Sequence, residues 1–498
     1  MSFSVFLLLF NWLIEGNFAN KWKSLKARPG VIIFLGVILV HVVWLINSID
    51  LDYGFNDIKI KLPLLVLPLI LGTTTRIKQH QLKIIIFFFI LSVLIGTIIS
   101  SGVLFGIGNI EIHDIREISI FIHHVRFGVL VVLAIFLLLN ELIYFPKKNE
   151  FFFNLIKWIS LLWLILFLFI LKSITGLALL FIIGFLFGFS LFFQKHKLNY
   201  RNVVKIAWLL TFIFLTVTFI RYYVRYSFVE EVDLSNLEST TTNGNFYKHN
   251  LENPQLENGN YVWIYVCEEE LKKEWQKRSQ LDYEGLDYKN QELRYTIIRY
   301  LSSRGVRKDS AGLASIKPEE IEWIENGIAN YIYVNQTSMY PLVYNIFWQL
   351  DSRERGDNPT GHSVIQRMEH LNAGIQIFKK NFWFGIGTGD VKLAFGQYYE
   401  EVNSQLSMEV RHRAHNQFLT FLIAFGLIGF LLATLSLVLP IYFERGFGNP
   451  YFIIFITVAF LSFMVEDVLE TSAGSMFFAY FYSLFLFAYQ NISELESK

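Results

Sequence analysis

The stretch RHRAHNQFLTFLIAFGLIGFLLA, residues 411–433, joins a cluster of basic residues and histidines directly to a long apolar run. A helix needs about 20 predominantly apolar residues to cross the hydrocarbon core of a bilayer. Together with the apolar residues that follow, this run is long enough. It predicts a membrane-spanning helix over about 415–438 whose first residues are polar.

Ten further apolar stretches indicate that the whole chain is built around such helices. They lie at residues 3–15, 31–48, 62–74, 84–104, 118–140, 152–171, 175–193, 205–220, 451–468 and 473–490. The composition agrees, because 53% of the 498 residues are hydrophobic and only 17% are charged, against about 25% charged in a soluble domain. We predict an all-α polytopic membrane protein with about 11–12 transmembrane helices.

Basic residues gather in the loops that follow the first, third, fifth and seventh spans, whereas the alternate loops are acidic or poor in basic residues. They are Lys21, Lys23, Lys26, Arg28, Arg76, Lys78, Lys83, Lys147, Lys148, Lys157, Lys195, Lys197, Arg201 and Lys205. By the positive-inside rule the basic loops are cytoplasmic. This count puts residue 1 on the outer side, so we expect either one more helix before it or a half-inserted hairpin over residues 1–15.

One large polar segment interrupts the spans, and the same count places it outside the cytoplasm. The predicted division is 1–225 for the N-terminal membrane helices, 226–410 for the large outer loop and 411–498 for the C-terminal membrane helices. Within the loop we expect helices in CEEELKKEWQKRSQ (267–280) and QELRYTIIRYLSSRG (291–305), and a third that starts at Pro318 with acidic residues in its first turn. The loop should therefore be mostly helical.

Charge and cysteine content exclude several classes of protein. The formal net charge is +1, which gives no support for an extended basic surface that would bind nucleic acid. A single cysteine, Cys267, cannot form an intramolecular disulfide or a multi-thiolate metal site. Because no His or carboxylate set has metal-ligand spacing, we expect neither a metal nor a cofactor.

His415 is the strongest candidate for chemistry. We expect it in the first turn of the helix, with Asn416 beside it, where unpaired N–H groups and the positive dipole end suit an anionic ligand. Arg411 and Arg413 add positive charge that disfavours the imidazolium, so a neutral His415 would be available as a general base. The alternative is a polar cap on a membrane helix.

Three arginines in or beside the membrane spans are candidate anion ligands. Arg126 lies well inside the apolar run IFIHHVRFGVLVVLAIF, where an intramembrane cation suggests a functional site; the alternative is an arginine that snorkels to the interface. Arg221 and Arg225, in FIRYYVRY, lie on one helical face and could bind two phosphates. The alternative for this pair is an interfacial anchor.

A fourth arginine and a glycine-rich run lie late in the loop. Arg367, in SVIQRMEHLNAGIQIF, sits on a predicted helix, where an exposed ion pair with Glu369 is the simpler interpretation. The run FWFGIGTGD, residues 382–390, matches neither the dinucleotide fingerprint nor the P-loop. We therefore interpret it as a tight turn at the membrane surface.

The order of these motifs resembles a known family. The chain carries HHVRFGVL at the fifth span, SVIQRMEHLNAGIQIFKKNFWFGIGTGD late in the loop, RAHNQFLTFLIAFGLIG after it, and VEDVLETSAG near the tenth span. With one large outer loop before the last few helices, this arrangement is similar to the O-antigen ligase and O-antigen polymerase superfamily of bacterial cell envelopes.

The resemblance implies an integral-membrane glycosyltransferase at the periplasmic face of the bacterial inner membrane. Its donor would be a polyprenyl-diphosphate-linked glycan, and its acceptor a lipid A core sugar in a ligase, another lipid-linked repeat in a polymerase, or a protein. By the same resemblance His415 is the general base, and Arg221 or Arg225, together with Arg367, binds the diphosphate. The expected reaction inverts the anomeric carbon without a metal.

Two questions stay open at this level. Ligase and polymerase share their chemistry and differ in acceptor, and we favour the ligase. The rival from another class is a polysaccharide transporter or flippase, which would be marked by inverted repeats or by helices broken at mid-membrane. We find no such repeat in the sequence.

Overall fold

A computed structural model of the chain describes residues 3–108, 112, 115–144, 151–193, 201–335 and 338–489. Within these ranges the regular secondary structure is helical apart from isolated bridges and one pair of two-residue strands, β1 (Leu256–Glu257) and β2 (Asn260–Tyr261). The predicted class, an all-α polytopic membrane protein, is confirmed.

The helices form two compact units. The first unit comprises residues 1–201 and 366–498, and the second comprises residues 202–365. The first contains α1 (Phe3–Ile14), α2 (Phe18–Lys26), α3 (Pro29–Phe34), α4 (Gly36–Val43), η1 (Trp44–Asn47), α5 (Leu51–Lys61), α6 (Pro63–Thr73), α7 (Gln79–Leu104), η2 (Ile115–Ile118), α8 (His124–Tyr144), α9 (Phe151–Leu171), α10 (Ile174–Phe193), most of α17 (Ser363–Lys380), α18 (Val391–Glu401), η4 (Met408–Val410), α19 (Gln417–Phe443), η5 (Gly446–Gly448), α20 (Pro450–Phe463), η6 (Val468–Glu470), α21 (Ser472–Ser483) and η7 (Leu484–Ala488). The second contains α11 (Arg201–Ser227), β1, β2, α12 (Glu268–Trp275), α13 (Leu293–Ser303), α14 (Ser310–Ser315), α15 (Pro318–Glu325), η3 (Tyr331–Val334) and α16 (Tyr340–Glu354).

Each predicted span coincides with helical structure over most of its length. In the described part of the chain, six helices are long and apolar enough to cross a membrane, and four shorter apolar helices accompany them. The predicted total of 11–12 spans stays a prediction. The fifth span begins later than expected, because α8 starts at His124 and not at residue 118.

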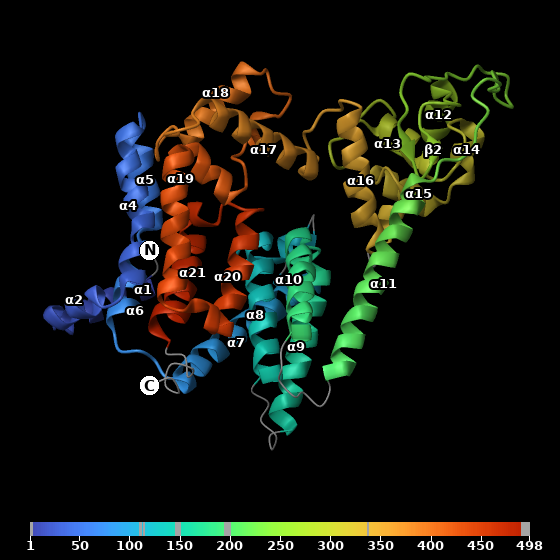
Figure 1. Cartoon of the computed structure of the whole chain (residues 1–498). Helices are drawn as coiled ribbons and strands as arrows, with labels where there is room; N and C mark the ends of the chain where they lie inside the picture. The colour runs from blue at the N-terminus through green and yellow to red at the C-terminus, as the bar shows by residue number, and fades with distance from the viewer. Residues whose placement is uncertain are drawn as a thin grey trace. The chain divides into compact units, whose positions relative to one another are not determined.

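The first unit is organised around α8. This helix packs against α7, α9, α10 and α20 (Figure 1). In its most apolar 18-residue stretch 78% of the residues are buried, against 28% in the corresponding stretches of α7 and of α9. A helix that is apolar on all sides is suited to an interior position among other helices. It follows that α8 is an inner helix of the bundle, whereas α7 and α9 present apolar side chains to the outside.

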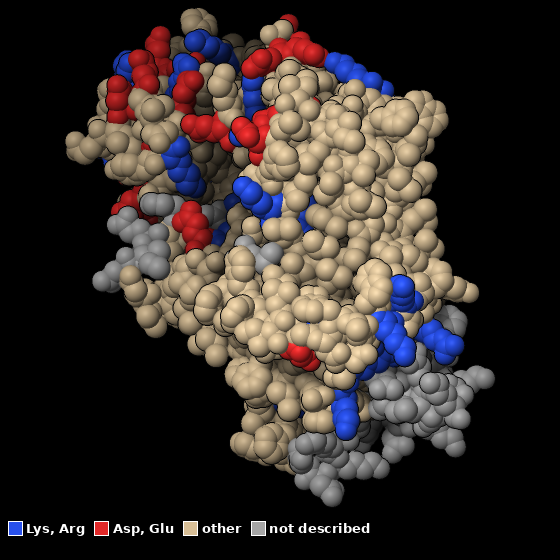
Figure 2. All heavy atoms as spheres, turned by 90° about the vertical axis from the view of Figure 1, so that its left-hand side faces the viewer, with Lys and Arg blue, Asp and Glu red and all other residues tan. Residues whose placement is uncertain are grey.

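The outside of the unit carries the surface that a bilayer requires. Figure 2 shows a broad face of uncharged residues with charged side chains gathered towards its ends. Large apolar side chains are exposed on the membrane helices, among them Phe10, Phe87 and Phe88. Of the lysines used to predict orientation, Lys147, Lys148, Lys195 and Lys197 lie outside the described residues, and the cytoplasmic assignment of the basic loops stays a prediction.

Helix α19 is broken at Gly426, whose backbone angles are φ 63° and ψ −171°. The turn that the glycine-rich run predicted lies against this break, and Gly385 and Gly387 adopt positive φ there. The amide of Ile386 donates to the carbonyl of Ile423 at 3.0 Å, and that of Gly387 donates to the carbonyl of Ala424 at 2.9 Å. Backbone groups freed by the break are thereby satisfied by protein, as a non-helical segment within an apolar bundle requires.

The second unit combines α11 with those helices of the predicted loop that precede residue 363. The helices expected near 267–280 and 291–305 and from Pro318 are confirmed as α12, α13 and α15. The loop boundaries 226–410 describe a side of the membrane, whereas the compact units describe packing, so the predicted division of the chain stays a prediction.

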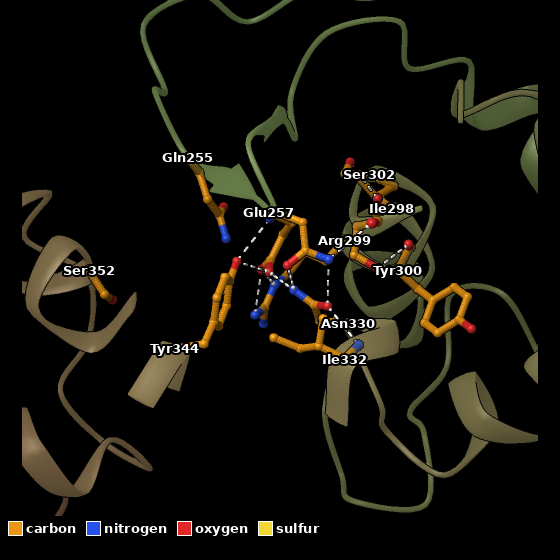
Figure 3. A network of polar contacts seen from close by, with 12 residues as sticks. Gln255, Glu257, Ile298, Arg299, Tyr300, Ser302, Asn330, Ile332, Tyr344 and Ser352 are labelled. Atoms are coloured by element: carbon orange, nitrogen blue, oxygen red, sulfur yellow. Dashed lines mark hydrogen bonds and ion pairs between the residues drawn. The ribbon is translucent and has the colours of Figure 1, made fainter. Parts of the chain in front are cut away.

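A buried carboxylate links the elements of the second unit (Figure 3). Glu257 of β1 is fully buried. It accepts hydrogen bonds from Arg299 Nε of α13 at 2.8 Å, from Asn330 Nδ2 at 2.7 Å and from the Tyr344 hydroxyl of α16 at 3.2 Å. A buried charge that is paired and hydrogen-bonded in this way stabilises one arrangement of its neighbours.

Replacing Gly426 by alanine should destabilise the first unit by about 2 kcal/mol or more, because only glycine adopts this backbone region without strain of about 1–3 kcal/mol. An added Cβ would also lie 2.4 Å from the carbonyl oxygen of Trp383. Gly184→Ala is the matched control, since its Cβ would meet only Phe136 at 3.8 Å. Equal thermal stability of the two variants in detergent would contradict this account of the break.

Candidate active site

A polar cavity of about 630 Å³ in the first unit brings together several residues that the sequence singled out. Predicted site residues that line it are Arg126, Arg411, Arg413 and His415. The remaining walls come from α5, from α18 and from the segment between α20 and α21, whose carboxylates face the same space. The cavity therefore contains a histidine, several cations and several carboxylates within one unit of the fold.

His415 lies immediately before α19 and not in its first turn as expected. The helix begins at Gln417, and Asn416 is the N-cap residue, whose Oδ1 accepts a hydrogen bond from the amide of Leu419 at 3.0 Å. Asn416 also donates to the carbonyl of Met464 at 3.0 Å. His415 has φ +48°, a left-handed conformation that is uncommon outside glycine. The Asn416 cap thus holds His415 directly before the start of α19, where its side chain lines the cavity.

A carboxylate lies beside His415. Glu466 Oε2 is 3.7 Å from His415 Nδ1, and Glu466 Oε1 is 3.4 Å from Arg367 Nη2. Burial alone would raise the pKa of Glu466, but His415 and Arg367 outweigh it and hold this pKa below its ordinary value. Glu466 is therefore a carboxylate that faces the histidine ring, and Arg367 pairs with it across the fold.

A buried ion network adjoins the cavity through Arg413 and Glu470, which both line it. Arg413 Nη1 is 3.1 Å from Glu470 Oε2, and Lys61 Nζ is 3.0 Å from the same oxygen. Lys61 also pairs with Asp57 at 2.6 Å, and Gln417 Nε2 donates to the other Glu470 oxygen at 3.0 Å. Two cations and two carboxylates are thereby combined, and removing one partner would leave an uncompensated buried charge. This network fixes Arg413 at the cavity wall.

Three histidines lie together near the cavity. The ring of His370 is 5.6 Å from that of His415 and 5.8 Å from that of His412, between centroids. His370 Nε2 is 2.8 Å from the carbonyl oxygen of Val410, and its buried Nδ1 has no partner among the described residues. Burial lowers the pKa of His370 to about 4, so this ring is neutral at pH 7.

The depressed pKa of His370 predicts a loss of stability in mild acid. An unfolded histidine takes up a proton near pH 6.5, whereas folded His370 does so near pH 4, so the free energy of unfolding should fall as the pH drops through this interval. His370→Gln should flatten that dependence, and exposed His80 supplies the control His80→Gln. Thermal melts of both variants between these pH values would measure it; parallel curves would refute the assignment.

Arg126 lies at the junction of two cavities. It is in the first turn of α8, and so at the end of the helix and not well inside it as the apolar run suggested. It lines the polar cavity and also an adjoining apolar cavity of about 420 Å³ between α1, α8 and α21. Within the described part of the chain its guanidinium has no hydrogen-bond or ion-pair partner. It is thus available to an anion at the border of apolar and polar space.

Arg411 has a different environment. Its Nε donates to the carbonyl of Leu406 at 3.0 Å and its Nη2 donates to that of Ser404 at 3.2 Å. The Tyr399 hydroxyl of α18 holds the same loop through the carbonyl of His412 at 2.9 Å. Arg411 therefore shapes the cavity wall through backbone contacts.

Arg221 and Arg225 belong to the second unit, on the last two turns of α11. Both are exposed, and the guanidinium of Arg225 lies 4.2 Å from the centre of the Tyr340 ring. This contact is a cation–π pair within the second unit. Binding of donor phosphates by these two residues stays a prediction.

Sequence reasoning missed the carboxylate partners. Glu466 and Glu470 lie in VEDVLETSAG, which contributes to the family resemblance but gives no sign of their partners, and Lys61 belongs to no motif. A usable signal was the i,i+4 pair of Asp57 and Lys61 beside an apolar span. Among the described residues no group of three His, Cys, Asp or Glu side chains could hold a metal ion, and the expectation of a metal-independent reaction stays a prediction.

Comparison with known families gives one match. Residues 328–434 match a family model described as O-Antigen ligase, and this range includes Arg367, His415 and the Gly426 break. The match confirms the predicted resemblance to the O-antigen ligase and polymerase superfamily. It supports ligase- or polymerase-type activity in a multi-pass bacterial membrane protein. A comparison with curated proteins found no match.

Proposed function

We propose that the protein is a glycosyltransferase that moves a glycan from a polyprenyl diphosphate carrier to a lipid A core sugar, at the periplasmic face of the bacterial inner membrane. The observation that carries the proposal is the polar cavity in which His415 faces Glu466 and which adjoins an apolar cavity at Arg126. A donor with an apolar tail and a charged head needs an apolar cavity and a polar cavity that adjoin each other. The family match supports ligase- or polymerase-type activity alike, and the choice of a ligase is part of the proposal.

The donor would lie across the junction of the two cavities. Its polyprenyl tail would occupy the apolar cavity between α1, α8 and α21, which is lined almost entirely by apolar side chains such as Val129 and Phe477. Its diphosphate would meet Arg126, which can bind phosphate oxygens through two N–H groups. The glycan would then extend into the polar cavity beside His415.

Transfer would proceed by direct displacement at the anomeric carbon. His415 Nδ1 faces Glu466, so Nε2 is free to take the proton of the acceptor hydroxyl. The acceptor oxygen forms a bond to the anomeric carbon as the bond to the diphosphate oxygen breaks, and the electron pair leaves with the diphosphate. Attack opposite the leaving group inverts the anomeric configuration. Glu466 stabilises the imidazolium formed in this step.

The arginines divide the work of charge stabilisation. Negative charge grows on the leaving diphosphate, and preorganised cations in a partly dehydrated site stabilise it better than water does. Arg126 is the proposed primary ligand, and Arg413 adds positive potential from the wall of the cavity. Arg367 orients Glu466. The proposal that Arg221 and Arg225 are donor ligands rests on the family resemblance alone.

Loss of the gene tests this function in the cell. We expect the envelope glycolipid ladder to fall to bare lipid A core while long polyprenyl-linked glycans accumulate. Wild-type protein should restore the ladder. His415→Ala, shown to be inserted at normal level, should not, because a general base contributes about 10²–10⁴-fold in rate.

Other outcomes discriminate among the alternatives. A ladder that collapses to core plus one repeat would make the protein a polymerase. An unchanged ladder would point to a protein acceptor or refute the envelope-glycan function. Full complementation by His415→Ala, with His80→Ala as the matched control, would refute the general-base role.

Arg126 and Arg411 form a second contrast. Arg126→Gln should raise the donor KM about tenfold or more, since a hydrogen bond to a charged group contributes about 1.5–3 kcal/mol, without lowering the melting temperature. Arg411→Gln should lower the melting temperature, because it loses two backbone carbonyl contacts. Transfer from purified lipid-linked donor and thermal melts in detergent measure both. An unchanged donor KM in Arg126→Gln would remove this residue from the donor site.

A further inference from the structure

Helix α18 separates the polar cavity from a second polar cavity. Lys392, Gly396 and Glu400, spaced four residues apart, line the first cavity. The neighbouring positions Gln397 and Tyr398 line the second, which has a volume of about 370 Å³ and lies between α18, the end of α17 and the 385–390 turn. Consecutive residues of a helix lie about 100° apart, so the two cavities adjoin on neighbouring faces of one helix.

The charged groups of the second cavity are already compensated. Lys380 Nζ is 2.6 Å from Glu401 Oε2. The two carboxylate oxygens of Asp390 each accept a backbone hydrogen bond at 2.8 Å, from Ile49 and from Asp50. The cavity therefore offers little free charge to a ligand.

Uncharged polar groups remain available there. Within the described residues, the side-chain amide of Gln397 and the hydroxyl of Tyr398 have no hydrogen-bond partner. An amide supplies both donors and an acceptor, and a phenol supplies one of each. These groups, together with the ring of Tyr398, suit a neutral, polyhydroxylated ligand. The volume of the second cavity is within the range of small-molecule sites, about 300–1,000 Å³.

Gly396 leaves free space on the surface of α18 between the two cavities. It lies inside the helix, its φ is not positive, and a Cβ placed there would meet nothing within 4 Å. Glycine disfavours a helix relative to alanine, and here neither the backbone nor the packing requires it. Gly396 and Gln397 are both exposed. The absent side chain leaves room for a molecule that passes from one cavity to the other.

We infer that a saccharide chain crosses α18 at Gly396 and that its sugars beyond the reacting residue occupy the second cavity, held by Gln397 and Tyr398. The inference rests on the proposed glycosyl transfer and adds a subsite to it. The chain belongs to the donor glycan or to the acceptor saccharide; both present the same hydroxyl chemistry.

The test fills the free space at Gly396 on the surface of α18. Gly396→Trp adds a large side chain where the fold has room for it, and Val402→Trp adds the same side chain at an exposed position of the same segment that lines neither cavity. Lipid-linked glycan extracted from the source cells is separated into one-repeat and multi-repeat fractions. Each fraction is offered with lipid A core, either complete or truncated in its outer sugars. Glycan released from the multi-repeat fraction by mild acid serves as a binding probe without turnover.

We expect Gly396→Trp to lower the multi-repeat to one-repeat ratio of kcat/KM about tenfold, as the loss of a bound group does, and to weaken binding of the released glycan, while Val402→Trp keeps both values. If the complete core loses its advantage over the truncated core and the donor ratio holds, the chain is the acceptor's. Unchanged ratios and unchanged glycan binding in Gly396→Trp would overturn the inference. If wild-type protein transfers no lipid-linked glycan, the proposed function fails, and the binding arm still decides whether the saccharide site exists.

Discussion

The site depends on one constraint, the backbone hydrogen bonds between the broken helix α19 and the turn at 382–387. Besides the two bonds to the carbonyls before the break, the amide of Leu427 after it donates to the carbonyl of Phe382 at 2.8 Å. Because these bonds replace helical ones inside an apolar bundle, the turn cannot leave without exposing several unsatisfied groups. The turn connects α17 to α18, so these hydrogen bonds fix the end of α17 and the start of α18 against α19, and residues of α18 line the polar cavity with His415.

Two carboxylates of one short segment then divide the organisation of that cavity. Glu470 joins Lys61 to Arg413, and this buried network fixes a cation at the wall. Glu466 turns to the cavity, where it faces His415 and pairs with Arg367. One contact supports the fold and the other supports the proposed chemistry, although the two carboxylates lie only four positions apart. The segment 466–470 is thus the acidic counterpart of the basic run that precedes α19.

The sequence predicted what local patterns determine and missed what distant pairs determine. Hydropathy located the helices, and the glycine run located the turn. The helix at His415 begins two residues later than the pattern suggested, because Asn416 is its N-cap. The apolar run around Arg126 begins before α8 does, so Arg126 lies in the first turn of α8, and the choice between an intramembrane and an interfacial arginine stays open. The pairing of Glu470 with Lys61 joins residues 409 positions apart, and no local pattern predicts such a contact.

The partners that each arginine already has indicate which of them would bind an added anion most favourably. Arg413 and Arg367 already face carboxylates, and Arg411 already binds carbonyls, so an incoming phosphate would compete with existing partners. Arg126 makes no hydrogen bond or ion pair within the described residues, although its charge helps to lower the pKa of Glu466, and its desolvation is limited because it is only half-buried at the end of α8. Its net gain on meeting an anion is therefore larger than theirs. Since it also borders the apolar cavity, the same side chain would fix both the charge and the depth at which an amphiphilic donor binds.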